Sequence, residues 1–209
     1  MTITIFGATG MVGKHLVQQA LLMGHTVKAF GRNVFTSNFA DNKNLQLVQG
    51  ALFDAREVLQ AIKGSDAVLS VLGGAIDGSD KSRSLGLKNI VAQMEKAGLK
   101  RLVAVGGMGV LSAADDSLIM DDENYPAEFL PVGQEHLKAY ETLKGSSLTW
   151  TFVCPPDIID AGVTGSYRTM ADYPPTPNFY KINAGDLAMC MLNELQKNEY
   201  VNKRVGISN

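Results

Sequence analysis

Residues 3–13 read ITIFGATGMVG and indicate the class of fold. The run Ile3–Phe6 is apolar and β-branched, as a buried strand is, and a pattern of helical period begins at Val12. Between them, glycines stand at positions 7, 10 and 13. A strand, a glycine-rich turn and a helix in this order are the context of a dinucleotide-binding turn. An ordinary structural turn with the same glycines is the alternative interpretation.

Each glycine has a physical role in such a site. Gly7 allows the tight turn, Gly10 lets the backbone approach a pyrophosphate, and Gly13 lets the helix pack close to the strand. The start of the helix offers unpaired N–H groups and a partial positive charge to phosphate oxygens. We therefore expect the cofactor to be held by Gly7, Ala8, Thr9, Gly10, Met11, Val12 and Gly13.

The alternation of strand and helix continues along the chain. Further β-rich runs occupy residues 26–30, 45–49, 67–72, 101–105 and 149–153, with segments of helical period between them. Near-continuous apolar strands are typical of a parallel sheet that is covered on both faces. The sequence thus predicts one α/β domain over residues 1–209, a Rossmann-type doubly wound parallel sheet with helices on both faces.

Composition and charge narrow the class of protein. The 209 residues carry a net charge of −2 and are 45% hydrophobic, which predicts a globular chain without general attraction to nucleic acid or anionic membranes. The N-terminus lacks the features of a signal peptide and no apolar stretch is long enough to span a membrane, so we expect a cytoplasmic location. Two cysteines without metal-ligand spacing predict neither a disulfide framework nor a metal site.

Two long segments interrupt the alternation. Residues 106–131 form an acidic loop after the fifth predicted strand, and residues 154–183 contain five prolines after the sixth. Long loops in compact domains are usually functional or disordered. Because both follow strands at the same edge of the sheet, where ligands bind in this architecture, we expect them to flank the substrate.

The end of the second predicted strand decides between NAD and NADP. An acidic residue there would bind the ribose 2′-hydroxyl of NAD, but this chain has Gly31-Arg32-Asn33. Arg32 can pair with a 2′-phosphate and stack on adenine. We therefore expect NADP, with NAD as the other option and a solvated surface arginine as the alternative role.

With these features the chain resembles the atypical short-chain dehydrogenases/reductases of the NAD(P)H-binding group, and within it the biliverdin-IXβ reductase/NADPH-dependent flavin reductase type. The matching stretches are IFGATGMVG at 5–13, DAVLSVLG at 66–73, KNIVAQM at 88–94, RLVAV at 101–105, EHLKA at 135–139 and TFVCPPDIIDAGVTGSY at 151–167. The resemblance implies a monomeric Rossmann enzyme that passes hydride from NADPH to flavins, and in some members to tetrapyrroles. It also implies further cofactor contacts at Ala51, Leu52, Leu72, Gly73, Gly74, Gly106, Gly107, Lys138, Pro155 and Pro156.

The chain departs from the family pattern at three places. The family tends to show Gly-Asp after the third strand, where this chain has Gly50-Ala51, so the adenine contact falls to the backbone of Leu52. The serine near the nicotinamide is replaced by the turn at Gly106-Gly107, and the histidine after the paired prolines by Asp157. We expect Asp54 to cap the following helix. The resemblance therefore predicts the position of the cofactor in this chain better than it predicts the identity of the substrate.

A Tyr-x-x-x-Lys pair, the acid of standard short-chain dehydrogenases, occurs at Tyr140 and Lys144. We interpret it as a chance match, because Lys144 falls at the end of its helix that is furthest from the cofactor. The first turns of this helix carry Gln134, which is not an acid, and Lys138, which either contacts a ribose hydroxyl or is solvated. A site without an evident acid suits flavin or quinone-like acceptors better than alcohols, since the cofactor and acceptor carry the hard chemistry.

Three residues remain as catalytic candidates, each with an alternative role. Asp157 is a proton relay or a structural turn residue, His136 lines the pocket as an acid or is not involved, and Tyr125 stacks on a planar acceptor or packs in a lid. Cys154 is expected to be buried and inert. The favoured function is an NAD(P)H-dependent reductase of flavins or similar planar small molecules. A non-catalytic NADP sensor of the NmrA type is the second hypothesis. A sugar-nucleotide epimerase or dehydratase ranks last, because 209 residues leave little room for a C-terminal substrate domain.

Overall fold

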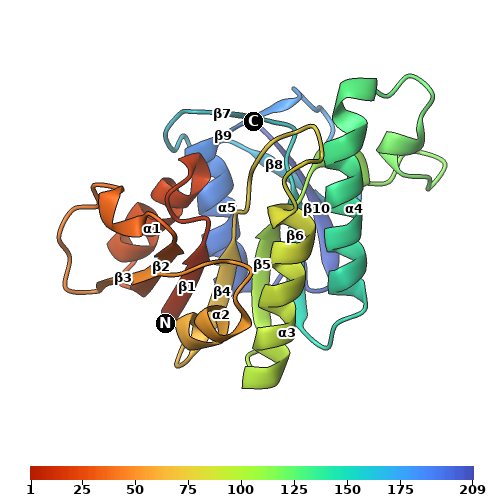
Figure 1. The fold of residues 1–209 in the computed structure, drawn as a ribbon. Coiled ribbons are helices and arrows are strands. Elements are labelled where there is room, and N and C mark those ends of the chain that lie inside the picture. Colours follow the sequence, from red (N-terminus) through yellow and green to blue (C-terminus); the bar gives the residue numbers. More distant parts are fainter.

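The order of the strands places a switch point beside the first one. A computed structural model describes residues 1–209 and contains an eight-stranded sheet in the order β3-β2-β1-β4-β5-β6-β10-β8 (Figure 1). The strands are β1 (Thr2–Phe6), β2 (Thr26–Gly31), β3 (Leu45–Gln49), β4 (Ala67–Ser70), β5 (Arg101–Val105), β6 (Thr149–Cys154), β8 (Arg168–Ala171) and β10 (Lys203–Ser208). All neighbouring pairs are parallel except β8 with β10. The chain proceeds outward from β1 in both directions, so a crevice forms where β1 adjoins β4.

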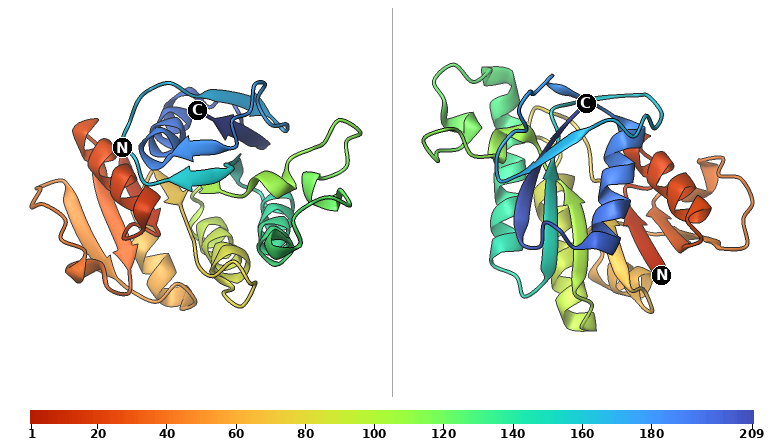
Figure 2. Two further views of the ribbon diagram at one scale, coloured as in Figure 1. Left: turned by 90° about the horizontal axis from the view of Figure 1, so that it is seen from above. Right: turned by 180° about the vertical axis from the view of Figure 1, so that it is seen from behind.

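Helices cover both faces of the sheet, as Figure 2 shows from above and behind. They are α1 (Met11–Leu22), α2 (Ala55–Ile62), α3 (Leu87–Ala97), α4 (Leu130–Lys144) and α5 (Ala184–Lys197). In β1, Ile5 belongs to the core beneath α1 and α5, whereas Phe6 belongs to the core beneath α2, α3 and α4. Because successive strand residues face opposite sides, both faces must be apolar, which explains the near-continuous hydrophobic runs.

The predicted fold class is confirmed, and the structure adds four strands to it. Besides β8 and β10, the strands β7 (Asp157–Ile159) and β9 (Lys181–Asn183) pair in parallel as a small separate sheet. These strands are short or, like β10, begin with charged residues, so they lack the apolar run that revealed the other six. The segment 154–183 is therefore not a plain loop. Residues 106–131 contain three single turns of 3₁₀-helix.

Candidate cofactor and acceptor site

The turn between β1 and α1 accepts only glycine at two of its positions. Gly7 has a φ of +80°, and a Cβ there would stand 2.4 Å from the Val71 carbonyl oxygen. A Cβ on Gly13 would stand 2.1 Å from the Gly7 carbonyl oxygen. Gly10 differs, because its φ is −77° and a Cβ would meet only the Gly7 oxygen, at 3.4 Å. Packing thus explains Gly7 and Gly13, and leaves Gly10 to be explained by something that approaches from outside.

The N-terminus of α1 has the features of a phosphate site. Its N-cap residue Gly10 offers no side chain, and no acidic residue stands in the first turn. By contrast, α2 is capped by Asp54, whose carboxylate accepts from the N–H groups of Arg56 (2.8 Å) and Glu57 (3.1 Å), as expected from the sequence. The first N–H groups of α1 therefore keep their capacity to bind an anion, and the exposed backbone at Gly10 lets one approach. These residues fit a dinucleotide pyrophosphate.

The ends of β2, β3 and β4 lie along the same edge as this turn. Arg32 is exposed directly after β2 and forms no ion pair in the structure. Leu52 and Leu72, after β3 and β4, both pack against Gly86 and form an apolar wall that suits adenine. The Ala51 N–H already donates to Glu57 Oε2 (2.5 Å), and the Leu52 carbonyl accepts from Asn89 Nδ2 (2.8 Å). The backbone polar groups expected to contact adenine are thus partly used within the protein.

The glycines after β5 make room for neighbouring side chains. A Cβ on Gly106 would stand 2.6 Å from Phe152 Cε1, and one on Gly107 would stand 2.7 Å from His136 Cδ2. The His136 ring therefore packs directly on the backbone of Gly107. This contact gives a structural reason for glycine at this position, because a larger side chain would displace the imidazole.

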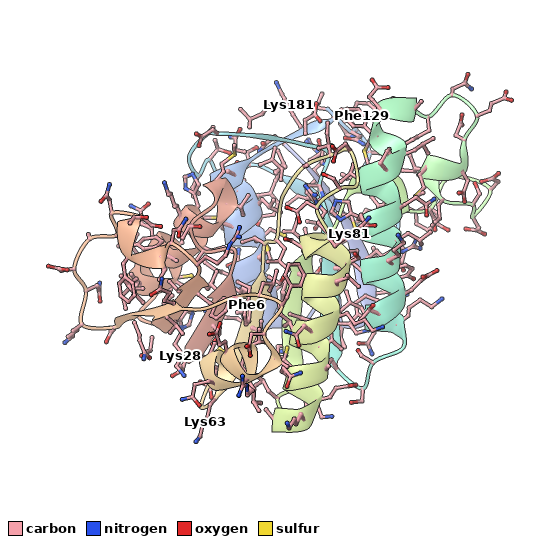
Figure 3. All side chains as sticks on the ribbon, viewed as in Figure 1. Phe6, Lys28, Lys63, Lys81, Phe129 and Lys181 are labelled. Atoms are coloured by element: carbon pink, nitrogen blue, oxygen red, sulfur yellow. The ribbon has the colours of Figure 1, made fainter.

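A cavity of about 1070 Å³ opens beside Gly107, between the two long segments. Pockets that bind small molecules usually have volumes of about 300–1,000 Å³, so this cavity is large enough for a multi-ring compound. The cavity brings the three catalytic candidates together with part of the predicted cofactor site, namely Tyr125, His136, Asp157, Gly107, Pro155 and Pro156. Phe129, which also lines it, lies at the upper edge of the molecule in Figure 3, whereas Lys63 lies at the opposite end. Gly106 and Lys138 do not line the cavity.

His136 is held neutral at ordinary pH. Burial, and to a smaller extent the nearby Arg83 guanidinium, lower the pKa of its imidazole to about 3, although Glu135 opposes the shift. Nδ1 is buried without a hydrogen-bond partner in the protein. A neutral imidazole can donate or accept a hydrogen bond, but it is not a strong proton source. The structure therefore favours His136 as a hydrogen-bonding group at the cavity wall.

The other two candidates differ in their surroundings. Burial raises the pKa of the half-buried Tyr125, and its hydroxyl lies against the backbone of Gly109. Asp157 is exposed at the start of β7, where its register partner on β9 is Lys181. No group of three or more His, Cys, Asp or Glu side chains is arranged to hold a metal ion.

Comparison with known proteins connects this geometry to a family. A family model described as NAD(P)H-binding matches residues 7–198. The chain belongs to the NAD(P)H-binding family. The match includes the Gly7–Gly13 turn and both segments that line the cavity.

Three solved structures resemble this NAD(P)H-binding protein over nearly their whole length. One is described as a "putative exported protein" from Burkholderia pseudomallei, with 30% identity, a TM-score of 0.85 and complete coverage of both chains. Another, a "putative NADH-flavin reductase" from Streptococcus pneumoniae, has 25% identity and a TM-score of 0.85 and covers 100% and 99% of the two chains. The third, a "putative epimerase" from Bacteroides thetaiotaomicron, has 29% identity and a TM-score of 0.83 and covers 99% and 96%.

These comparisons confirm the resemblance to short-chain dehydrogenases/reductases of the NAD(P)H-binding group and NAD(P)H as the cofactor class. The chain is thus an NAD(P)H-binding protein of an oxidoreductase family with a Rossmann fold. The single domain, the individual site residues and the monomeric state stay predictions. None of the helices has both the length and the apolar character needed to cross a membrane. The cytoplasmic location also stays a prediction.

The sequence did not reveal a buried carboxylate in α4 of this NAD(P)H-binding protein. Glu135 is 2% exposed, and it accepts hydrogen bonds from Lys81 (3.0 Å), Lys138 (2.9 Å) and the Ser84 hydroxyl. Burial raises its pKa, but these hydrogen bonds outweigh that effect and lower the pKa to about 2. The spacing of Glu135 and Lys138 indicates an ion pair on a helix, but its burial depends on the segment around Ser84, which is distant in sequence. Lys138, expected at a ribose, is thus anchored to Glu135.

The Tyr-x-x-x-Lys match lies outside the cavity. Tyr140 packs edge-on against Trp150, with ring centroids 6.0 Å apart, and stacks with Phe152 at 6.4 Å. Lys144 lies over the Tyr140 ring, 5.6 Å from its centroid. Cys154 is fully buried, and burial raises the pKa of its thiol to about 12, in agreement with the expected inert cysteine.

Proposed function

We propose that this chain is an NADPH-dependent reductase that transfers hydride to a flavin or a similar planar acceptor held in the cavity. The observation that carries the proposal is the position of the cavity, beside Gly107 and Pro155 at the ends of β5 and β6. In a Rossmann fold, a dinucleotide whose pyrophosphate lies at the start of α1 crosses the ends of the central strands toward this place. The Streptococcus relative is described as a "putative NADH-flavin reductase", which supports a flavin acceptor but names NADH instead of NADPH.

The proposal assigns the protein binding and orientation. The Gly7–Gly13 turn and the start of α1 bind phosphates, Arg32 pairs with a 2′-phosphate, and the wall of Leu52 and Leu72 contacts adenine. When bound, NADPH supplies the hydride. Aromatic side chains of the cavity, Tyr125 among them, provide surfaces on which a planar ring can stack.

Hydride transfer to a flavin does not require a strong acid in the protein. The hydride binds to a ring nitrogen, and the second nitrogen of the reduced ring takes its proton from solvent. The neutral His136 fits this requirement, because it can hold the acceptor by a hydrogen bond without giving up a proton. Asp157 is exposed enough to exchange protons with solvent and is proposed as the relay.

The test is NADPH oxidation by the purified protein with riboflavin, FMN and a quinone as acceptors. We expect acceleration of NADPH absorbance loss with at least one of them, and preference for NADPH over NADH. Tight NADPH binding without acceleration across this panel would refute the reductase and favour the sensor. In that case equal binding of NADP⁺ and NADPH would weaken the sensor hypothesis too, since a sensor must distinguish the two redox states.

An epimerase is the weaker candidate, although the size of the chain does not count against it. The relative described as a "putative epimerase" is covered to 96% by this chain, so that description belongs to a solved chain of nearly the same length. The lining of the cavity argues against epimerase activity. Tyr140 of the Tyr-x-x-x-Lys match does not line the cavity and packs against Trp150 instead. Conversion of a sugar nucleotide by the protein with catalytic NADP⁺ would overturn this ranking.

A further inference from the structure

The cavity is lined without a single lysine or arginine. Its ionisable lining side chains are Asp122, Asp157, His136 and three tyrosines. His136 is neutral because burial lowers its pKa to about 3. The two carboxylates therefore give the cavity a net negative charge at neutral pH.

The segment that forms one side of the cavity adds to this charge. Residues 106–131 contain six acidic residues, of which Asp122, Glu123 and Glu128 are examples, and no lysine or arginine. These three side chains are exposed. Asp122 lines the cavity, and Glu123 and Glu128 are next in sequence to the lining residues Asp122 and Phe129. The field of such carboxylates reaches about a Debye length, ~8 Å at physiological salt.

Two cations near the cavity, Arg204 and Lys181, are not among its lining residues. Arg204 lies behind the wall, where it donates to the Val110 carbonyl (2.6 Å) and the Ser112 hydroxyl (2.9 Å) and has Asp172 at 3.5 Å. Lys181 is the register partner of Asp157, but no ion pair joins them.

Arg83, the cation whose charge acts on His136, donates to the carbonyls of Gly74 (2.9 Å) and Ala75 (2.9 Å) on the cofactor side. A bound dinucleotide would bring further negative charge to that side.

From this arrangement we infer that the cavity selects planar acceptors without a negative charge, of the riboflavin type, and discriminates against phosphorylated or carboxylated acceptors. The inference rests on the proposed function, and it narrows the class of acceptor. A phosphate carries about −1.5 to −2 charge at neutral pH. For a phosphate placed one Debye length, ~8 Å, from both carboxylates in water, the repulsion lowers the affinity about 15- to 30-fold at low salt and about threefold at physiological salt.

Riboflavin and FMN are the matched probes, because they share one ring system and differ by a phosphate. We expect kcat/KM to favour riboflavin by at least about threefold, with a ratio that narrows as salt is added. Titration of each flavin's fluorescence with the protein, without NADPH, gives the same comparison for binding alone. Equal or better use of FMN at low salt would overturn the inference.

Variants connect the selectivity to the two carboxylates. Asp122→Asn and Asp157→Asn should each bring the riboflavin-to-FMN ratio closer to one, and Asp122→Lys should reverse it. Asp160→Asn is the control, because Asp160 is exposed in the same segment as Asp157 but does not line the cavity. A loss of proton relay at Asp157 would slow both flavins equally, so the ratio separates the two roles. An unchanged ratio in all three lining variants would refute the inference.

The outcomes also separate this inference from the proposed function. If neither flavin is reduced but riboflavin binds better than FMN, the proposed reductase activity is refuted and the charge selection is supported. If both flavins are reduced equally at low salt, the reductase activity is supported and the charge selection is refuted. If neither flavin binds, both are overturned.

Discussion

Replacing Gly10 by alanine is expected to weaken NADPH binding while the fold stays intact. The backbone at Gly10 has a φ of −77°, which alanine adopts freely, and the added Cβ would meet only the Gly7 carbonyl oxygen at 3.4 Å. The exposed face of this residue is where a pyrophosphate must approach the start of α1. A methyl group there interferes with the ligand and with nothing in the protein.

The size of the effect follows from the hydrogen bonds at risk. Pushing the phosphate away from the helix start loses one hydrogen bond to a charged group, about 1.5–3 kcal/mol. This corresponds to a Kd for NADPH about tenfold to a hundredfold higher. Alanine is a poorer N-cap than glycine but also restricts the unfolded chain, so the two effects on folding, each about 1 kcal/mol, oppose one another. The melting temperature should therefore shift by less than about 4 °C.

The assay is calorimetric titration with NADPH together with a thermal melt. The matched control is Gly145→Ala, at the C-cap of α4, where φ is −80° and the added Cβ would meet only carbonyl oxygens, those of Glu141 at 3.5 Å and Thr142 at 3.9 Å. It should bind NADPH like the unmodified chain. A Kd for Gly10→Ala within twofold of the unmodified value, with an intact fold, would refute the assignment of this turn to the pyrophosphate.

Three further predictions concern the cofactor choice, acid stability and thiol reactivity. Arg32→Ala should raise the Kd for NADPH about tenfold and leave the Kd for NADH nearly unchanged. Equal effects on both cofactors would refute the assignment of Arg32 to the 2′-phosphate. Glu135, whose pKa falls from 4.5 to about 2 on folding, contributes stability above about pH 4.5 that is lost as the pH falls toward 2. Acid titrations of unfolding should show about 3 kcal/mol of this loss, and Glu135→Gln should flatten it; an unchanged profile would contradict the ion cluster. Cys154 and Cys190, with pKa values raised to about 12 by burial, should react with thiol reagents near pH 8 only after denaturation.

The fold could be predicted because its central strands are apolar on both faces. Ile3 and Ile5 pack beneath one helical layer and Phe6 beneath the other, so the sequence shows a run that only a buried strand explains. Strand β10 was missed because it begins with Lys203 and Arg204, and its place beside β6 is decided by tertiary pairing. Local patterns carry no information on such a pairing.

The cofactor side of the candidate site could be predicted from the sequence because the spacing of glycines is a local signal. The acceptor side depends on contacts between distant segments. Gly107 could be recognised as a departure from the family, but the histidine ring that occupies the space comes from α4. The burial of Glu135 could not be predicted from the sequence, because its partners Lys81 and Ser84 come from the segment before α3. Burial of a charged residue is a property of the assembled fold.

A crystal structure of the protein with NADP⁺ and riboflavin would show whether the cofactor and the acceptor meet in the cavity. We expect the pyrophosphate on the Gly7–Gly13 turn and the flavin in the cavity between residues 106–131 and 154–183. We also expect the nicotinamide C4 to lie about 3–3.5 Å from the flavin nitrogen that receives the hydride. A dinucleotide bound elsewhere, or a nicotinamide that faces away from His136 and the cavity, would contradict these expectations.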